Sequence, residues 1–378
     1  MRICSPHCGL AENSGSGGEV FERDLLRGLA DAGDTPHILL AQGKSYPREM
    51  ARYIEPIWPL RRGLRWPVAA GAFAYYILRC WRQHRFDLLR AHSLRFTGPA
   101  CLLAKRLGVT APLVVHLHHL DPDPLNRLIE RPVMEAADLV IADSHFAAGQ
   151  AKALGVRHDR IRVAHCGAPE QYRPAERLSP GDGAVAEKYG LWGHDVVLAV
   201  GPLIERKDPH LVVRAFAAAH RPGVDDAVLL WMGAGPLKAS VAALADGLGV
   251  GDRVRFPGHV PESDKMSLYR LADLFVHGSR LEGFPLAVLE AMACGKPVVG
   301  FRAASMEELV VPGGTGLLAD TPAEFARHLG TLLASPGLRK AMGATGARRI
   351  DQRFRWSRTV AEVRRAYYET VGNAAPRG

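Results

Sequence analysis

The sequence lacks any apolar run long enough to span a membrane. Residues 1–7 also lack the apolar core of a secretory signal peptide. These two absences predict a cytoplasmic protein. Disulfide bonds are not expected either, because the six cysteines are scattered and lie mostly in apolar segments. We therefore expect free thiols in a reducing compartment.

Two functional motifs are also missing. The sequence contains no Gly-x-Gly-x-x-Gly, which counts against an NAD-dependent dehydrogenase. No nucleic-acid-binding motif accompanies the basic composition, in which 48 Lys and Arg outnumber 39 Asp and Glu to give a net charge of +9. Such a charge favours acidic partners in general, such as phosphorylated small molecules, anionic lipids or nucleic acid. Because the basic residues are spread along the whole chain, we expect no nucleic-acid binding.

The length and composition suit a globular protein of two domains. The chain has 378 residues, of which 47% are hydrophobic, enough for two full cores. Strand and helix patterns alternate through both halves, which is typical of an α/β fold with parallel sheets. The predicted strands are 37–41, 87–93, 112–119, 137–144, 160–167, 196–201, 228–236, 254–260, 274–277 and 297–299. Residues 174–193 resemble a loop, so we place the boundary there, between 178 and 179.

The most informative stretch is residues 280–300. Pro285 is favoured in the first turn of a helix, and Gly295 is a natural stop beyond its end. The apolar run between them therefore predicts a short helix. Gly283 precedes it in a loop, and the N–H groups at the start of such a helix suit a phosphate.

Two carboxylates accompany this loop. Glu282 lies on the turn and Glu290 lies inside the predicted helix, among Leu, Ala, Val and Met. An acid in that setting is costly to bury unless it is hydrogen-bonded, and carboxylates accept hydrogen bonds from neighbouring hydroxyls of a sugar or ribose. On spacing alone, the alternative remains open that Glu282 is a solvated loop acid and that Glu290 lies on the exposed face of the helix.

The whole stretch closely resembles the signature of the family 4 retaining glycosyltransferases. The matching features are Glu282 and Glu290, the Glu-Gly-Phe-Pro between them and the Glu-Ala-Met-Ala-Cys-Gly-Lys-Pro-Val-Val that follows. The resemblance implies the GT-B fold, with two Rossmann-like domains facing a cleft. It implies an acceptor-binding domain at 1–178, a nucleotide-sugar-binding domain at 179–354 and a helix at 355–378 that crosses back to the first domain.

The resemblance also implies the chemistry. The donor would be a nucleotide-diphosphate sugar, a UDP-sugar in preference to a GDP-sugar, and the acceptor a hydroxyl of a small molecule or glycan. The acceptor would attack on the face that the diphosphate leaves, and the donor's own phosphate would take the proton. Transfer would need neither a metal nor another cofactor. The same cleft would also suit a sugar-nucleotide epimerase, and a non-catalytic nucleotide-sugar-binding subunit is a further alternative.

Site residues follow from the same resemblance. Glu290 would bind the ribose, Glu282 the sugar hydroxyls, and Lys207 the diphosphate. The implied donor-binding residues are Gly17, Gly18, Arg206, Lys207, Val260, Glu282, Gly283, Phe284, Pro285, Leu286 and Glu290. The implied catalytic residues are His118, Glu282 and Lys207, with His118 placed near the transferred sugar.

The sequence departs from the family pattern at two places. Position 202 is Pro where the family usually carries Arg. Either Arg206 supplies the second charge from another angle, or diphosphate binding depends more on Lys207 and the helix N-terminus. Ala304 and Ser305 replace a pair of glycines, which puts in question a close backbone approach at that loop.

Two further patterns have a less specific meaning. Residues 58–86 mix tryptophans and tyrosines with arginines, so peripheral membrane contact is conceivable, although an aromatic stripe packed on the protein's own sheet is favoured. His116, His118, His119 and Asp121 could suggest a metal site, but their tight spacing is no recognisable ligand set, and we expect no metal.

Overall fold

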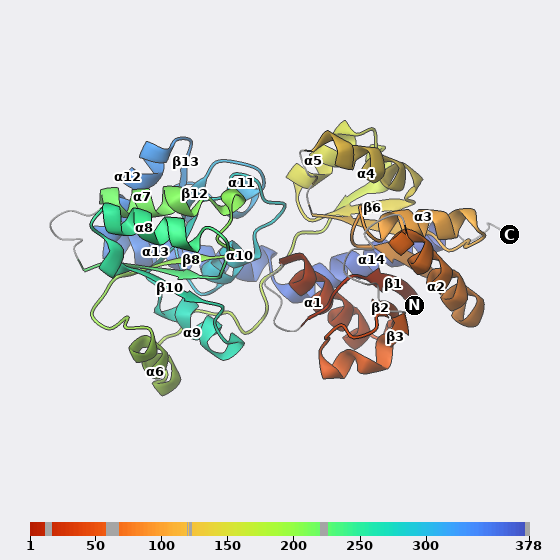
Figure 1. Ribbon diagram of the computed structural model, residues 1–378, viewed down its shortest axis with the longest axis horizontal. Helices are drawn as coiled ribbons and strands as arrows, with labels where there is room; N and C mark the ends of the chain where they lie inside the picture. The colour runs from red at the N-terminus through yellow and green to blue at the C-terminus, as the bar shows by residue number, and fades with distance from the viewer. Residues whose placement is uncertain (12–16, 58–67, 119, 121–122, 220–225, 375–378) are drawn as a thin grey trace. The chain divides into compact units, whose positions relative to one another are not determined.

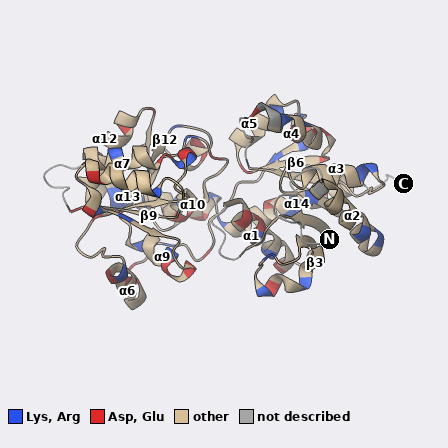
Figure 2. Cartoon of the chain, in the orientation of Figure 1, with Lys and Arg blue, Asp and Glu red and all other residues tan. Residues whose placement is uncertain are grey.

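The computed structural model covers residues 1–378, and the structure describes all of them except 12–16, 58–67, 119, 121–122, 220–225 and 375–378. The chain forms two compact units (Figure 1). The first comprises Met1–Cys166 with Ser357–Gly378, and the second comprises Gly167–Trp356. Basic and acidic residues are interspersed on the helices of both units (Figure 2).

The first unit is built on a seven-stranded parallel sheet with the order β3-β2-β1-β4-β5-β6-β7. Its strands are β1 (Arg2–His7), β2 (Thr35–Ala41), β3 (Ile54–Ile57), β4 (Leu88–Ala91), β5 (Leu113–Leu117), β6 (Leu139–Ala142) and β7 (Ile161–Val163). Its helices are α1 (Gly17–Asp31), α2 (Val68–His84), α3 (Gly98–Arg106), α4 (Pro124–Ala136), α5 (His145–Ala153) and α14 (Trp356–Ala374), with short 3₁₀ turns η1 (Arg48–Tyr53) and η2 (His158–Arg160).

The second unit is built on a six-stranded parallel sheet with the order β10-β9-β8-β11-β12-β13. Its strands are β8 (Val196–Val200), β9 (Val228–Met232), β10 (Val254–Gly258), β11 (Leu274–His277), β12 (Val298–Phe301) and β13 (Gly316–Ala319). Its helices are α6 (Pro180–Lys188), α7 (Pro209–Ala219), α8 (Lys238–Gly247), α9 (Glu262–Leu271), α10 (Leu286–Ala293), α11 (Met306–Leu309), α12 (Pro322–Leu333) and α13 (Pro336–Arg353), with 3₁₀ turns η3 (Glu205–Lys207) and η4 (Gly251–Arg253).

Both sheets are covered on both faces, as their apolar strands require. In β2, Leu39 packs into the core beneath α2 to α5, whereas its neighbours Ile38 and Leu40 pack with α1 on the opposite face. In β11, Val276 packs with α7 and α12, and the Phe275 ring stacks on Tyr269 of α9. The expected doubly wound α/β architecture is therefore confirmed for each unit.

The strand order reverses between β1 and β4 in the first sheet and between β8 and β11 in the second. Ligands of open parallel sheets bind at such reversals, beyond the carboxyl ends of the strands. In the second unit this edge carries the loop after β8, with Arg206 and Lys207, and the loop after β11, with Glu282 and Gly283. Topology alone thus brings together the segments that the sequence had singled out.

The first unit ends at Cys166, earlier than the boundary expected at 178. Residues just beyond Cys166 belong with the end of the second unit, because Ala168 pairs with Arg355 as a parallel bridge. The guanidinium of Arg355 also donates to the carbonyl oxygens of Pro169 and Tyr172, at 3.3 and 2.9 Å. These contacts attach the segment from Ala168 to Tyr172 to the second unit.

The remaining expectations concern thiols and membranes. All six cysteines are free, and only Cys8 is exposed. Within the described residues, no helix has both the length and the apolarity needed to cross a bilayer. Of the aromatic and basic segment 58–86, residues 58–67 lie outside the described residues. Helix α2 packs Phe73 and Ile77 into the first core and exposes Tyr75.

Close backbone packing at the end of β9 leads to a stability prediction. Gly233 has a φ of 141°, and a Cβ placed there would lie 2.1 Å from the carbonyl oxygen of Gly201. We expect Gly233→Ala to destabilise the protein by about 2 kcal/mol, because backbone must move to relieve the contact. Gly247→Ala is the matched control, since nothing lies within 4 Å of its added Cβ. Urea unfolding followed by tryptophan fluorescence would show a lower midpoint for Gly233→Ala alone; equal midpoints would contradict the prediction.

Candidate active site

The loop between β11 and α10 has the expected form, with one adjustment. Helix α10 begins at Leu286, and Pro285 is its N-cap residue (φ −77°, ψ 105°) rather than part of its first turn. Phe284 is buried and its ring packs on Phe354 at a centroid distance of 5.6 Å. This anchor holds Gly283 at the entrance to the helix, where first-turn N–H groups have no acceptor within the helix.

Glu282 is the centre of a charged cluster. Its Oε1 accepts hydrogen bonds from Arg206 Nη1 at 2.5 Å and Lys207 Nζ at 2.6 Å. The side chain is only 12% exposed, so the alternative of a solvated loop acid is wrong. Burial alone would raise the pKa of Glu282, but the positive charges of Lys207 and Arg206 outweigh it and lower this pKa to about 2. The site therefore holds one carboxylate and two cations near neutral pH.

Turn η3 places these cations. It follows β8 and ends at Asp208, whose φ of 44° redirects the chain into α7. Lys207 is nearly buried, and burial lowers its pKa despite the nearby Glu282. Arg206 also donates to the carbonyl oxygen of Leu281 at 3.1 Å, which ties η3 to the loop before α10. Arg206 thus contributes a second positive charge beside Lys207, whereas Pro202, where the family usually carries Arg, contributes none.

The loop with Ala304 and Ser305, where the family usually carries two glycines, has an unusual backbone. Ala304 has a φ of 51°, in the region that a glycine adopts without strain. Ser305 Oγ donates to the carbonyl oxygen of Glu282 at 3.3 Å. The loop therefore turns at Ala304, and Ser305 supports the backbone of Glu282.

Glu290 is buried on α10 and both its oxygens have partners. Lys265 Nζ donates to Oε1 at 2.8 Å, and the Tyr269 hydroxyl donates to Oε2 at 2.6 Å. The residue is 6% exposed, so the alternative that it lies on the exposed face of the helix is wrong. Val260 lies just before α9, between β10 and the helix that supplies Lys265 and Tyr269.

Sequence reasoning missed three residues of this unit. Lys265 and Tyr269 are four apart on α9, a spacing that places them on one helix face and could have pointed to a shared carboxylate. His277 ends β11 and is buried, and its Nε2 lies 3.7 Å from Glu282 Oε1. Burial, reinforced by the charge of Lys207, lowers the pKa of His277 to about 3, so the ring is neutral.

In the first unit, His118 directly follows β5. Its Nδ1 lies 3.2 Å from Asp143 Oδ2, and its Nε2 lies 3.7 Å from Glu22 Oε1. Burial would lower the pKa of His118, but these two carboxylates raise it to about 9. Gly17 and Gly18 are exposed and begin α1; the rest of the glycine-rich loop lies outside the described residues.

The histidines considered for a metal do not act as one group. His116 is buried and its Nε2 lies 2.6 Å from the hydroxyl of Tyr367, whereas His118 faces the two carboxylates described above. His119 and Asp121 lie outside the described residues. No shared ligand site for these four residues can be built from the part of the chain that the structure describes.

Comparisons with known proteins identify the family of the chain. Residues 188–349 match the glycosyl transferases group 1, and residues 15–172 match glycosyltransferase family 4. The D-inositol 3-phosphate glycosyltransferase of Acidothermus cellulolyticus is 32% identical over an alignment of 383 positions that covers 93% of this chain and 81% of that protein.

Two solved structures share the fold. Sucrose-phosphate synthase from Thermosynechococcus elongatus superposes with a TM-score of 0.84 at 20% identity, covering 99% of this chain and 100% of that one. Anabaena Alr3699/HepE, solved in complex with UDP, has a TM-score of 0.80 at 21% identity and covers 98% and 100%. Together with the two parallel sheets, these likenesses confirm the GT-B fold. The chain belongs to the group 1 glycosyltransferases of family 4.

Proposed function

We propose that this glycosyltransferase moves a sugar from a UDP-sugar to a hydroxyl group of a phosphorylated polyol, with retention of anomeric configuration. The observation that carries the proposal is that Lys207 and Arg206 both donate hydrogen bonds to the Glu282 carboxylate, just before α10. A UDP donor is supported by the complex of the structural neighbour Alr3699/HepE. A phosphorylated polyol is supported by the D-inositol 3-phosphate named for the relatives.

The donor would bind through groups of the second unit. Glu290, oriented by Lys265 and Tyr269, would accept hydrogen bonds from the ribose hydroxyls. The diphosphate would take Lys207 and Arg206 as counter-ions and lie against the N–H groups at Gly283 to Leu286. Glu282 would then release part of its contact with the cations and accept hydrogen bonds from the sugar.

Rate acceleration would come mainly from charge stabilisation at the leaving group. The diphosphate gains negative charge as the bond to the sugar breaks, and preorganised cations in a partly buried site stabilise such charge strongly. Lys207 and Arg206 together supply two positive charges, so we propose that no divalent cation is required; activity that survives EDTA treatment would test this point.

Retention would follow from attack on the face that the diphosphate leaves, with a diphosphate oxygen taking the acceptor's proton. His118 is held between Asp143 and Glu22, and its raised pKa keeps the ring protonated at neutral pH. It would therefore act as a hydrogen-bond donor rather than remove a proton. Comparing the anomeric proton signals of donor and product by NMR would test retention.

We expect UDP to raise the melting temperature more than GDP, ADP, TDP or NAD. A ligand at a hundred times its dissociation constant adds about 2.7 kcal/mol to the free energy of unfolding, which a thermal-shift assay detects easily. NAD is the negative control, because no Gly-x-Gly-x-x-Gly is present. A larger shift with GDP would change the assigned base. The absence of a shift with every diphosphate would contradict the donor site itself.

A further inference from the structure

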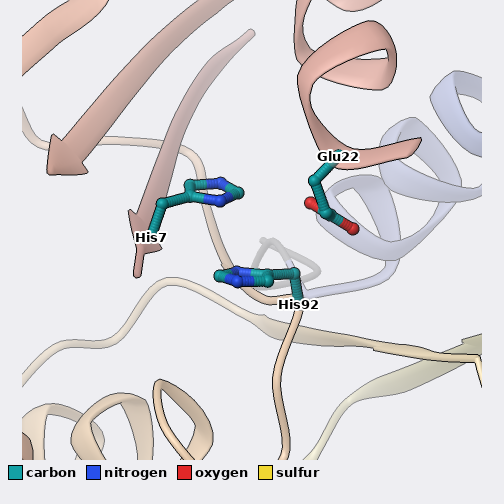
Figure 3. Close-up of side chains that lie close together, drawn as sticks. All are labelled: His7, Glu22 and His92. Carbon is teal, nitrogen blue, oxygen red and sulfur yellow. The ribbon is translucent and has the colours of Figure 1, made fainter. Parts of the chain in front are cut away.

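A group of buried polar side chains gathers in the first unit at the reversal of strand order between β1 and β4. His7 ends β1, Arg90 lies in β4 with His92 just after it, and Glu22 projects from α1. Figure 3 shows His7 and His92 as two stacked rings with the Glu22 carboxylate beside them. We call Ser5, His7, Glu22, Arg90, His92 and His118 the buried polar cluster.

Arg90 joins several members of the cluster through hydrogen bonds. Arg90 is completely buried, and its Nη1 donates to Glu22 Oε2 at 2.6 Å. Its Nε donates to the hydroxyl of Tyr367 at 2.9 Å, and Nη1 also contacts Ser5 Oγ at 3.3 Å. Burial would raise the pKa of Glu22, but the Arg90 charge holds it well below its usual range. Glu22 is therefore an ionised carboxylate with one oxygen anchored.

The cluster also has unused hydrogen-bonding capacity. Within the described residues, five buried atoms have no hydrogen-bond partner: His7 Nδ1, Glu22 Oε1, Arg90 Nη2, His92 Nδ1 and His118 Nε2. Buried polar atoms are paired in the great majority of cases, so several orphans in one place require an explanation. The His118 side chain is 25% exposed as a whole, so the cluster lies next to the surface there, although its Nε2 atom is itself buried.

The charges of the cluster exclude two classes of ligand. A metal cation would face Arg90 and the protonated His118, and the His7 and His92 rings are nearly parallel, with 10° between planes and 4.1 Å between centroids. The ligand atoms of His7, Glu22 and His92 lie within 4.8 Å of one another, but the Arg90 guanidinium that is bound to Glu22 would repel a cation there. An anion such as phosphate would meet the free oxygen of Glu22. Burial lowers the pKa of His92 to about 4, so that ring adds no positive charge to attract an anion.

A hydroxyl group suits the same atoms, because it both donates and accepts. Glu22 Oε1 is an acceptor and the protonated His118 Nε2 is a donor, and they lie 3.7 Å apart. A hydroxyl oxygen about 2.8 Å from each would complete both hydrogen bonds. The Nδ1 atoms of His7 and His92 offer positions for a neighbouring hydroxyl.

We propose that the buried polar cluster is a polyol-binding subsite, in which Glu22 accepts from, and His118 donates to, the same hydroxyl of the acceptor. The inference rests on the proposed function, since it requires a phosphorylated polyol as the acceptor. The cluster would bind hydroxyl groups of this acceptor, and other residues would bind its phosphate. Arg90 and Asp143 act as positioning residues, because one anchors Glu22 and the other orients His118.

The test uses the full-length protein and myo-inositol as the probe. We expect myo-inositol to shift the ring nitrogen resonances of His7, His92 and His118, and inorganic phosphate or Zn²⁺ to leave them unchanged. Glu22→Gln should weaken myo-inositol binding by about tenfold or more without changing UDP affinity. Glu55→Gln is the matched control: Glu55 lies in β3 of the same unit and contacts His37, outside the cluster. It should bind myo-inositol like the parent.

Glu22→Asp covers the case in which Glu22→Gln fails to fold, because it keeps the charge beside Arg90 and withdraws the free oxygen. Parent-like myo-inositol binding in either folded variant would overturn the proposal. Resonance shifts caused by Zn²⁺ or phosphate and lost in Glu22→Asp would also overturn it. On the parent itself, inositols that each lack one hydroxyl should differ in affinity; equal affinities would refute the hydroxyl assignment. UDP binding without polyol binding would refute this inference alone, whereas loss of UDP binding would refute the proposed donor site.

Discussion

Replacing Glu282 by glutamine should reduce kcat by about 100-fold while changing UDP affinity by less than about threefold. Glu282 Oε1 accepts hydrogen bonds from both Lys207 Nζ and Arg206 Nη1, at 2.6 and 2.5 Å. Within the described residues, no other acceptor is shared by these two groups. Without its charge, the two cations lose the group that holds them in register, and the sugar loses its carboxylate contact. The leaving diphosphate would still bind both cations, so the loss should fall on turnover.

Steady-state kinetics with a UDP-sugar and calorimetric titration with UDP would measure both parts of this prediction. Glu205→Gln is a suitable control, because Glu205 is exposed and belongs to the same 3₁₀ turn as the two cations. It should behave like the parent. An increase in KM with kcat unchanged would show that Glu282 contributes to binding alone, and would remove it from the transfer step.

Replacing Glu290 by glutamine should weaken UDP binding by about 10- to 100-fold, because hydrogen bonds to a charged group contribute about 1.5–3 kcal/mol. Lys265 Nζ and the Tyr269 hydroxyl donate to the two oxygens of Glu290, at 2.8 and 2.6 Å. Both partners are donors, so they orient the carboxylate and leave its remaining lone pairs for the ribose. Glutamine keeps the shape of the side chain but removes its charge and one acceptor.

A ribose-specific readout separates this role from a general loss of structure. Parent protein should bind UDP more tightly than 2′-deoxy-UDP, and Glu290→Gln should bind the two with nearly equal affinity. Glu187→Gln, an exposed position on α6 of the same unit, should preserve the parent's preference. If Glu290→Gln still preferred UDP as strongly as the parent does, the ribose assignment would be wrong.

The departures from the family pattern have a physical explanation in the structure. Position 202 is Pro and carries no positive charge. Arg206, in the 3₁₀ turn that follows, supplies a second cation beside Lys207. Ala304 keeps a left-handed backbone at φ 51°, and Ser305 supports the carbonyl oxygen of Glu282. Both loops therefore contact Glu282, whose part in a donor site stays a prediction.

Local sequence patterns determined the secondary structure around the site. Apolar runs bounded by glycine and proline predicted β11, α10 and β12, and the alternation of strands and helices predicted two parallel sheets. These features depend on residues a few positions apart, so they can be read along the chain. The family signature then predicted the roles of Glu282, Glu290 and Lys207, which stay predictions until the experiments above are done.

The tertiary structure decided which side chains meet. Lys207 and Glu282 are 75 positions apart, and Glu22 and Arg90 are 68 apart, yet each pair lies at 2.6 Å. Sequence periodicity does not predict such contacts. In a parallel sheet the spatial order of the strands differs from their order in the chain, so the carboxyl ends of strands that are distant in sequence can be neighbours. Burial of Glu290, the partners of His118 and the unpaired oxygen of Glu22 likewise depend on packing between elements. The sequence alone determined the helices, the strands and the family. The order of the strands in each sheet decided which side chains meet at the carboxyl ends of the strands.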